Sequence, residues 1–121
     1  MTAMVRALRG ATVVADDRPE SIAAATQELL VAMLTRNDLQ VDDAISVLFT
    51  STGDLVSAFP ASAAREVGFS GVPLLCAQEI PVPGSMQRVV RILMHVYTEK
   101  SKSDIEHVYL GEAQELRRDL D

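Results

Sequence analysis

The chain of 121 residues has no tryptophan, only one cysteine, and an aromatic content of 4%. A single cysteine excludes an internal disulfide and fits a reducing compartment, so we expect a cytoplasmic protein. With so few aromatic side chains, the core has to be built from Ala, Val, Leu, Ile and Met. A small domain of this composition often gains further burial by forming an oligomer.

Long apolar runs and an excess of positive charge are also lacking. No segment approaches the roughly 18 apolar residues of a membrane span, and no apolar signal-peptide region follows Met1. The formal net charge of −6 argues against a nucleic-acid backbone or an anionic membrane surface as partner. The glycine motifs of nucleotide-binding loops and of serine hydrolases are absent as well, so we expect neither a cofactor nor a metal.

Apolar residues, in contrast, make up 48% of the chain, which is typical of a globular protein. The length fits a single domain spanning residues 1–121. Nine of the 11 basic residues are arginine, since only Lys100 and Lys102 are lysine. Arginine binds carboxylates through paired hydrogen bonds, so an acidic protein of this kind can still bind a small anion at a local positive site.

The order of elements predicts an α+β fold. We expect strands at 5–14, 44–51, 72–80, 87–97 and 105–110, and helices at about 18–37 and 60–67. Gly10 suggests a bulge or kink in the first strand, and an aspartate before Pro19 suggests a helix cap. Only the first half leaves room for crossover helices. The β-α-β-α-β-β-β order therefore favours a mixed β-sheet with helices on one face.

Arg91 and Glu79 are the strongest candidates for chemistry. Arg91 interrupts the apolar run 89–94, and a buried guanidinium has to be paired or to face a ligand. It could equally pair with a nearby carboxylate or lie on the solvent face of an amphipathic strand. Glu79 ends a predicted strand just before a proline-rich turn, so it could be the partner of Arg91, a ligand contact or a solvated acid.

The other candidates have ordinary structural explanations. Cys76 lacks the His and Asn neighbours of a nucleophile and fits a small buried side chain. His95 and His107 show no metal-ligand spacing, and we take both as structural. Arg9, next to a glycine, could face a ligand or solvent, and Tyr109 could be a core residue with a satisfied hydroxyl.

Several segments together resemble the AroH class of chorismate mutases. In chain order they are Arg9-Gly10-Ala11-Thr12, Ala58-Phe59-Pro60-Ala61, Ala64-Arg65-Glu66, Val72-Pro73, Cys76-Ala77-Gln78-Glu79, Arg91 in its apolar strand, His107-Val108-Tyr109-Leu110 and Leu116-Arg117. Each segment is short, but the ordered set spans nearly the whole chain. The resemblance implies a homotrimer that forms a pseudo-α/β barrel, with active sites between subunits, and conversion of chorismate to prephenate without a cofactor.

The resemblance also implies a set of substrate-binding residues. One subunit would supply Arg9, Leu75, Cys76, Ala77, Gln78, Glu79, Arg91 and Tyr109, its neighbour Phe59, Ala61, Ser62 and Arg65, and the closing tail Leu116 and Arg117. The catalytic residues would be Arg91, acting on the ether oxygen, and Glu79, which with Cys76 would bind the ring hydroxyl. Arg9 and Tyr109 would hold a carboxylate.

Two positions depart from the family pattern. Ser62 stands where some relatives carry a lysine, and Leu75 stands where a threonine can occur. The first change weakens long-range attraction for a dianion, and the second removes a side-chain hydroxyl. The alternative to a mutase is a trimeric imine deaminase or ligand-binding protein of similar architecture, although the motif of those proteins around their arginine is not seen in this sequence.

Overall fold

The computed structural model describes residues 2–119, whose strands form one five-stranded sheet in the order β3-β2-β4-β1-β5. The elements are β1 (Met4–Val13), α1 (Pro19–Arg36), η1 (Val41–Asp43), β2 (Ala44–Ser51), α2 (Pro60–Glu66), η2 (Phe69–Gly71), β3 (Leu74–Gln78), β4 (Val89–Thr98), η3 (Lys102–Asp104), β5 (Val108–Tyr109) and η4 (Gly111–Asp119), where η marks a 3₁₀ helix. The predicted β-α-β-α-β-β-β order is confirmed, and so is the mixed sheet.

The sheet is built around β4, which runs antiparallel to both β1 and β2. The outer strands are parallel to their neighbours, with β3 beside β2 and β5 beside β1. A parallel pair needs a crossover connection, and α2 supplies it between β2 and β3. The last strands follow one another through shorter loops, as their spacing predicts.

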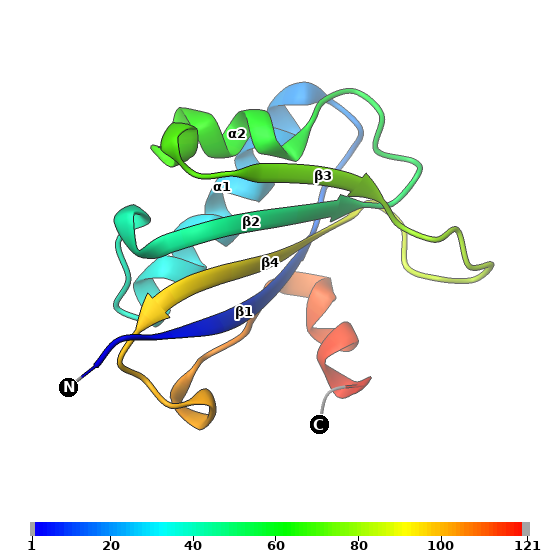
Figure 1. Cartoon of the computed structure of the whole chain (residues 1–121). Coiled ribbons are helices and arrows are strands. Elements are labelled where there is room, and N and C mark those ends of the chain that lie inside the picture. The colour runs from blue at the N-terminus through cyan, green and yellow to red at the C-terminus, as the bar shows by residue number, and fades with distance from the viewer. Residues whose placement is uncertain (1, 120–121) are drawn as a thin grey trace.

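Both α-helices lie on one side of the sheet, as predicted, while the C-terminal η4 lies on the other side next to β1 (Figure 1). The main core is formed between the sheet and the helices by fully buried side chains that include Leu8, Phe49, Met94, Leu29 and Met33. The expectation of a core without aromatic residues is wrong, because Phe49 and Phe69 are both buried in it. Successive strand residues point to opposite faces. The alternate positions, which include Arg9 and Arg91, therefore face away from α1 and α2.

The bulge or kink predicted at Gly10 is wrong. β1 pairs with β4 without interruption, and Gly10 lies opposite Ile92 in register. A Cβ atom at Gly10 would lie 2.6 Å from Sδ of Met33 and 3.1 Å from Cδ1 of Leu29. Glycine suits this position because the side chains of Met33 and Leu29 from α1 pack directly against β1 here.

The predicted aspartate cap of α1 is also wrong. The N-cap residue is Arg18, whose side chain makes no capping hydrogen bond, although Pro19 does begin the helix as predicted. Oδ1 of Asp17 instead accepts hydrogen bonds from the backbone N–H groups of Val56 and Ser57, both at 3.0 Å. The aspartate therefore connects the start of α1 to the loop before α2.

The final strand is shorter than predicted, because a side chain takes the place of a strand partner. The buried Asn37 donates from Nδ2 to the carbonyl oxygen of Glu106 and accepts the N–H of Glu106 at its Oδ1, both at 2.8 Å. The backbone at 106 is thus satisfied without a sheet. β3 is likewise shorter than the predicted 72–80, with only Leu74–Gln78 in the strand.

Candidate active site

An open hollow of about 430 Å³ lies on the sheet face that the two α-helices leave uncovered. Its walls come from β1, β2, β4, β5 and η4, and the residues are Arg9, Gly10, Leu48, Thr50, Arg91, Ile92, Leu93, Tyr109 and Leu116. The strand register explains this grouping, because Arg9 lies opposite Leu93, and Leu93 lies opposite Leu48. Four predicted site residues, namely Arg9, Arg91, Tyr109 and Leu116, are therefore brought together.

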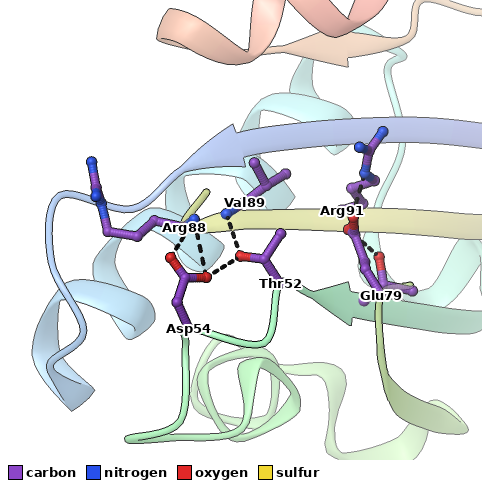
Figure 2. Close-up of polar contacts among 7 residues, drawn as sticks. Thr52, Asp54, Glu79, Arg88, Val89 and Arg91 are labelled. Atoms are coloured by element: carbon purple, nitrogen blue, oxygen red, sulfur yellow. Dashed lines mark hydrogen bonds and ion pairs between the residues drawn. The ribbon is translucent and has the colours of Figure 1, made fainter. Parts of the chain in front are cut away.

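Arg91 and Glu79 form an ion pair at this hollow. Nε of Arg91 donates to Oε2 of Glu79 at 3.0 Å, and Figure 2 shows the two side chains next to each other. The Arg91 side chain is 44% exposed and that of Glu79 is 16% exposed. The burial expected for Arg91 from its apolar neighbours is therefore wrong for the single chain, since alternation places it on the uncovered face. Both alternatives to burial are found together, because Arg91 is paired with Glu79 and also lies on the exposed face of its strand.

Thr50 completes this cluster. Its Oγ1 donates to the same Oε2 of Glu79 at 2.8 Å. Thr50 lies opposite Arg91 in the β2–β4 pairing, and the backbone N–H of Glu79 donates to the Ser51 carbonyl at 2.9 Å. Thr50, Leu48 and Leu93 were not predicted as site residues from the sequence. Alternation along 44–51 would have placed Leu48 and Thr50 on one face, but only the register shows that this face is the one with Arg91.

Arg9 is positioned by a residue far along the chain. Its backbone N–H donates to Nδ1 of His107 at 2.9 Å. Burial lowers the pKa of His107 below its usual value, and the positive charges of Arg9 and Arg117 lower it further. The neutral imidazole is therefore favoured, which keeps Nδ1 free to accept the hydrogen bond.

Tyr109 and Leu116 close the side of the hollow next to β1. Tyr109 pairs with Ala11 in the parallel β1–β5 ladder and is 9% exposed. It packs with Ala11 and Ala113, and the half-buried Leu116 lies against this cluster. Arg117, predicted to act with Leu116, is exposed and is not part of the hollow's wall. The 3₁₀ segment η4 thus places an apolar side chain over one end of the hollow.

The charges around the hollow are mostly positive. Arg9 and Arg91 contribute two cations to its wall, and Glu79 is bonded directly to one of them. The apolar residues Leu48, Leu93 and Leu116 line the same hollow. In a chain with a net charge of −6, this combination makes a local site for a small anion with an apolar part.

β3 divides its predicted site residues between the two sheet faces. Leu75, which is 60% exposed, lies opposite Leu48 and shares its face. Cys76 lies opposite the buried Phe49 and packs against the helix-covered core. The Cys76 side chain therefore points away from Arg91, and only its main chain is near that face. Ala77, opposite Thr50, returns to the open face, and Gln78 is again directed to the other one.

The residues predicted to come from a neighbouring subunit lie away from Arg91 in the single chain. Phe59 is 71% exposed and lines a second hollow of about 440 Å³, together with Cys76, Ala77 and Gln78. Ser62 and Arg65 are exposed on α2. Ala61, in contrast, is 5% exposed and belongs to the core, so its methyl group is not available to a ligand.

A hydrogen-bonded clamp joins the end of β2 to the start of β4, close to the ion pair (Figure 2). The Asp54 carboxylate accepts the backbone N–H of Arg88 at 3.0 and 3.2 Å and the Thr52 hydroxyl at 2.5 Å. Thr52 Oγ1 in turn accepts the N–H of Val89 at 3.0 Å. Burial raises the pKa of Asp54, but the hydrogen bonds from Thr52 and Arg88 outweigh it and hold the pKa below its usual value.

Two further features bear on the kind of protein. Among residues 2–119, no cluster of three or more His, Cys, Asp or Glu side chains is arranged to hold a metal ion. No helix in this described part is both long and apolar enough to cross a membrane. Fold and site together define a small α+β protein with a cationic, partly apolar hollow on the open face of its sheet.

Comparison with known proteins identifies the family. The model of the chorismate mutase type I family matches residues 5–120. Chorismate mutase AroH of Thermus thermophilus is 51% identical over 119 residues, 98% of each chain, and that of Bacillus subtilis is 39% identical over 118 residues, 97% of this chain and 93% of the relative. A solved chorismate mutase from Clostridium thermocellum matches with a TM-score of 0.88 at 50% identity, over 90% of this chain and 97% of that one. The chain belongs to the chorismate mutase type I family, whose members are isomerases, and the resemblance seen in the sequence is confirmed.

Proposed function

We propose that this chain converts chorismate to prephenate by an intramolecular Claisen rearrangement, with Arg91 stabilising the transition state. The observation that carries the proposal is the placement of Arg91, which Glu79 holds at the wall of a hollow that also contains Arg9. Family membership supplies the substrate. The reaction would belong to phenylalanine and tyrosine biosynthesis in the cytoplasm.

The rearrangement requires the enzyme to bind the substrate in a reactive conformation and to stabilise charge in the transition state. Chorismate is a dianion that rearranges in one unimolecular step, so a nucleophile or a general base has no task. The enzyme has to hold the enolpyruvyl arm over the ring, which removes conformational freedom before the reaction. It also has to stabilise negative charge that develops on the ether oxygen as the C–O bond breaks ahead of C–C bond formation.

Arg91 is suited to that second task. Within the described contacts of residues 2–119 it uses only Nε, toward Glu79, so Nη1 and Nη2 are available to the ether oxygen. A cation fixed in advance stabilises developing charge without reorganising at the moment of reaction. Arg9 and the Tyr109 hydroxyl would hold a substrate carboxylate, and Glu79 would accept a hydrogen bond from the ring hydroxyl.

A homotrimer is part of the proposal. The uncovered sheet face carries exposed apolar side chains, with Val5 at 52%, Leu75 at 60% and Tyr97 at 54% exposure. Burying them against another copy would add the core that a small, aromatic-poor chain lacks. A neighbouring copy would also bring the exposed Phe59 and Arg65 to the hollow, which explains why the single chain does not place them there.

The direct test is the loss of chorismate absorbance on adding micromolar purified protein. We expect rapid loss with wild type and very slow loss with Arg91→Ala at the same concentration. The absence of any loss with folded wild-type protein would reject the proposed function.

Mixed oligomers test whether two copies build each site. Arg91→Ala and Arg65→Ala are each expected to be nearly inactive, because each removes one half of the same site. Coexpressed in equal amounts, they should recover about a quarter of wild-type activity, since random assembly places an intact Arg91 beside an intact Arg65 at one site in four. Two inactive variants without any recovery would show that the site does not span subunits.

A further inference from the structure

We infer that Thr50 is a positioning residue of this site: its hydroxyl fixes the Glu79 carboxylate, and through it the guanidinium of Arg91, in the orientation that catalysis needs. The inference rests on the proposed function, because the orientation matters only if Glu79 and Arg91 handle the substrate. It assigns a role to a side chain that neither the sequence motifs nor the family resemblance singled out.

The strand register places Thr50 between the two residues that it serves. On one side it lies opposite Arg91 of β4, and on the other side it lies opposite Ala77 of β3. Glu79 follows β3 and continues its pairing, because its backbone N–H donates to Ser51 at 2.9 Å. The Glu79 side chain can therefore extend over β2 toward Arg91. Thr50, on β2, is in position to contact the Glu79 carboxylate.

Both donors converge on one carboxylate oxygen. Oε2 of Glu79 accepts from Thr50 Oγ1 at 2.8 Å and from Arg91 Nε at 3.0 Å. Within residues 2–119 no other hydrogen bond to the Glu79 side chain is found, so Oε1 is the oxygen left for a ligand hydroxyl. The two oxygens thus have separate tasks, one in holding the site together and one in binding.

The hydroxyl matters because the ion pair alone does not fix an orientation. The Arg91 side chain is 44% exposed, so packing alone does not fix its guanidinium, and the Glu79 side chain, although only 16% exposed, has several rotatable bonds that burial does not lock. One N–H···O bond lets the carboxylate rotate about the shared contact, and a second donor from a different direction stops that rotation. Since Arg91 is joined to Glu79 through Nε, any swing of the carboxylate also displaces Nη1 and Nη2.

The test compares Thr50→Val, which keeps the shape and loses the hydroxyl, with Thr50→Ser, which keeps the hydroxyl. We expect Thr50→Val to lower kcat by about 10- to 100-fold with a smaller change in KM, because misplacement is felt most in the transition state. Thr50→Ser should stay within about threefold of wild type. Thr50→Ala removes the same hydroxyl and gives the same comparison if the valine variant does not fold.

Thr26→Val is the matched control. It makes the same chemical change on α1, at a side chain that is fully buried on the helix-covered side of the sheet. It should leave kcat and KM unchanged. A double variant adds a measurement that a general loss of rigidity would not affect. In a Glu79→Gln background, Thr50→Val should reduce kcat by a much smaller factor than in wild type, because the carboxylate that Thr50 orients is gone.

The outcomes separate the two proposals. An inactive but folded wild type would overturn the proposed function itself. With an active wild type, unchanged kinetics in Thr50→Val would overturn the role of Thr50. Equal impairment of Thr50→Ser and Thr50→Val, or full additivity with Glu79→Gln, would overturn it as well, because the hydroxyl would then not act through the carboxylate.

Discussion

The backbone N–H of Arg9 donates a hydrogen bond to Nδ1 of His107, although the two residues are 98 positions apart. This contact fixes β1 to the segment that leads into β5, at the point where Arg9 enters the hollow. The contact requires an unprotonated Nδ1, and the lowered pKa of His107 favours that state.

The same hydrogen bond predicts a decline of stability in mild acid. Because the pKa of His107 is lowered in the fold, mainly by burial, unfolding takes up a proton once the pH falls below the usual value of 6.5. The contribution of His107 is complete above that pH. It decreases as the pH falls through the unfolded-state pKa toward the lower folded-state pKa.

Urea unfolding at fixed protein concentration, between about pH 7.5 and pH 5, measures this decline. His107→Asn keeps an acceptor oxygen near the Nδ1 position and cannot titrate. It should unfold with a smaller pH dependence than wild type in this range. An equal dependence in both proteins would assign the acid sensitivity to other groups.

Arg91→Ala should lower kcat/KM by about 100- to 1,000-fold, because it removes a preorganised cation from the developing charge. Arg91→citrulline, which has a similar shape but no charge, should be nearly as impaired. Steady-state kinetics with chorismate measure both effects. A citrulline variant with near wild-type activity would show that shape, and not charge, is what Arg91 contributes. Thermal melting shows whether each variant keeps its fold.

Gly10→Ala should destabilise the protein by about 1–3 kcal/mol, because the new methyl group overlaps Met33 and Leu29 in a closely packed core. Gly71→Ala is the matched control, since a Cβ there meets no atom within 4 Å and Gly71 has no positive φ. It should be neutral or slightly stabilising. Denaturant midpoints compare the two, and equal midpoints would contradict the tight packing of Met33 and Leu29 against Gly10.

Thr26→Val should stabilise the fold by about 1 kcal/mol. Thr26 is fully buried on α1, and its Oγ1 makes no hydrogen bond to the described residues. Valine has the same shape without a polar group that burial penalises. Thr26→Ser, which keeps the hydroxyl and loses the methyl group, should instead destabilise. A melting temperature that falls for the valine variant would show that the hydroxyl is satisfied.

Asp54→Asn should lower the melting temperature at neutral pH, because an amide accepts the Arg88 N–H and the Thr52 hydroxyl less strongly than a carboxylate does. The lowered pKa of Asp54 means that its contribution is present above the usual value of 3.8 and is lost as the pH falls through the folded-state pKa. The difference between variant and wild type should therefore shrink in strong acid. A difference that is constant from neutral to strongly acidic pH would contradict this.

Local sequence pattern predicted much of the fold. The bounds of β2 agree with the prediction, and β1 and β4 differ from it by small shifts, because alternation and turn residues are local signals. The loss of strand at 105–107 was not predictable, since it depends on Asn37, which lies in a different part of the chain.

The sequence allowed several residues of the candidate site to be predicted, but it did not allow their arrangement in space to be predicted. Arg91 stood out as a charge among apolar neighbours, but its exposure and its bond to Glu79 depend on strand order. The side-chain direction of Cys76 depends on the β2–β3 register. Thr50 carried no signal of its own, because a threonine in a β-rich segment is ordinary. Its proposed role depends on Arg91 of β4 and on Glu79, which follows β3.

In the proposed trimer, the sheet face that α1 and α2 leave uncovered makes enzyme activity depend on the concentration of the protein. When one copy provides Arg91 and another covers it, a dilute solution contains fewer complete sites per molecule than a concentrated one. Activity per milligram would then fall as the enzyme is diluted below the dissociation constant of the assembly. A bound substrate that contacts two copies at once would stabilise their association and so reduce this loss of activity on dilution.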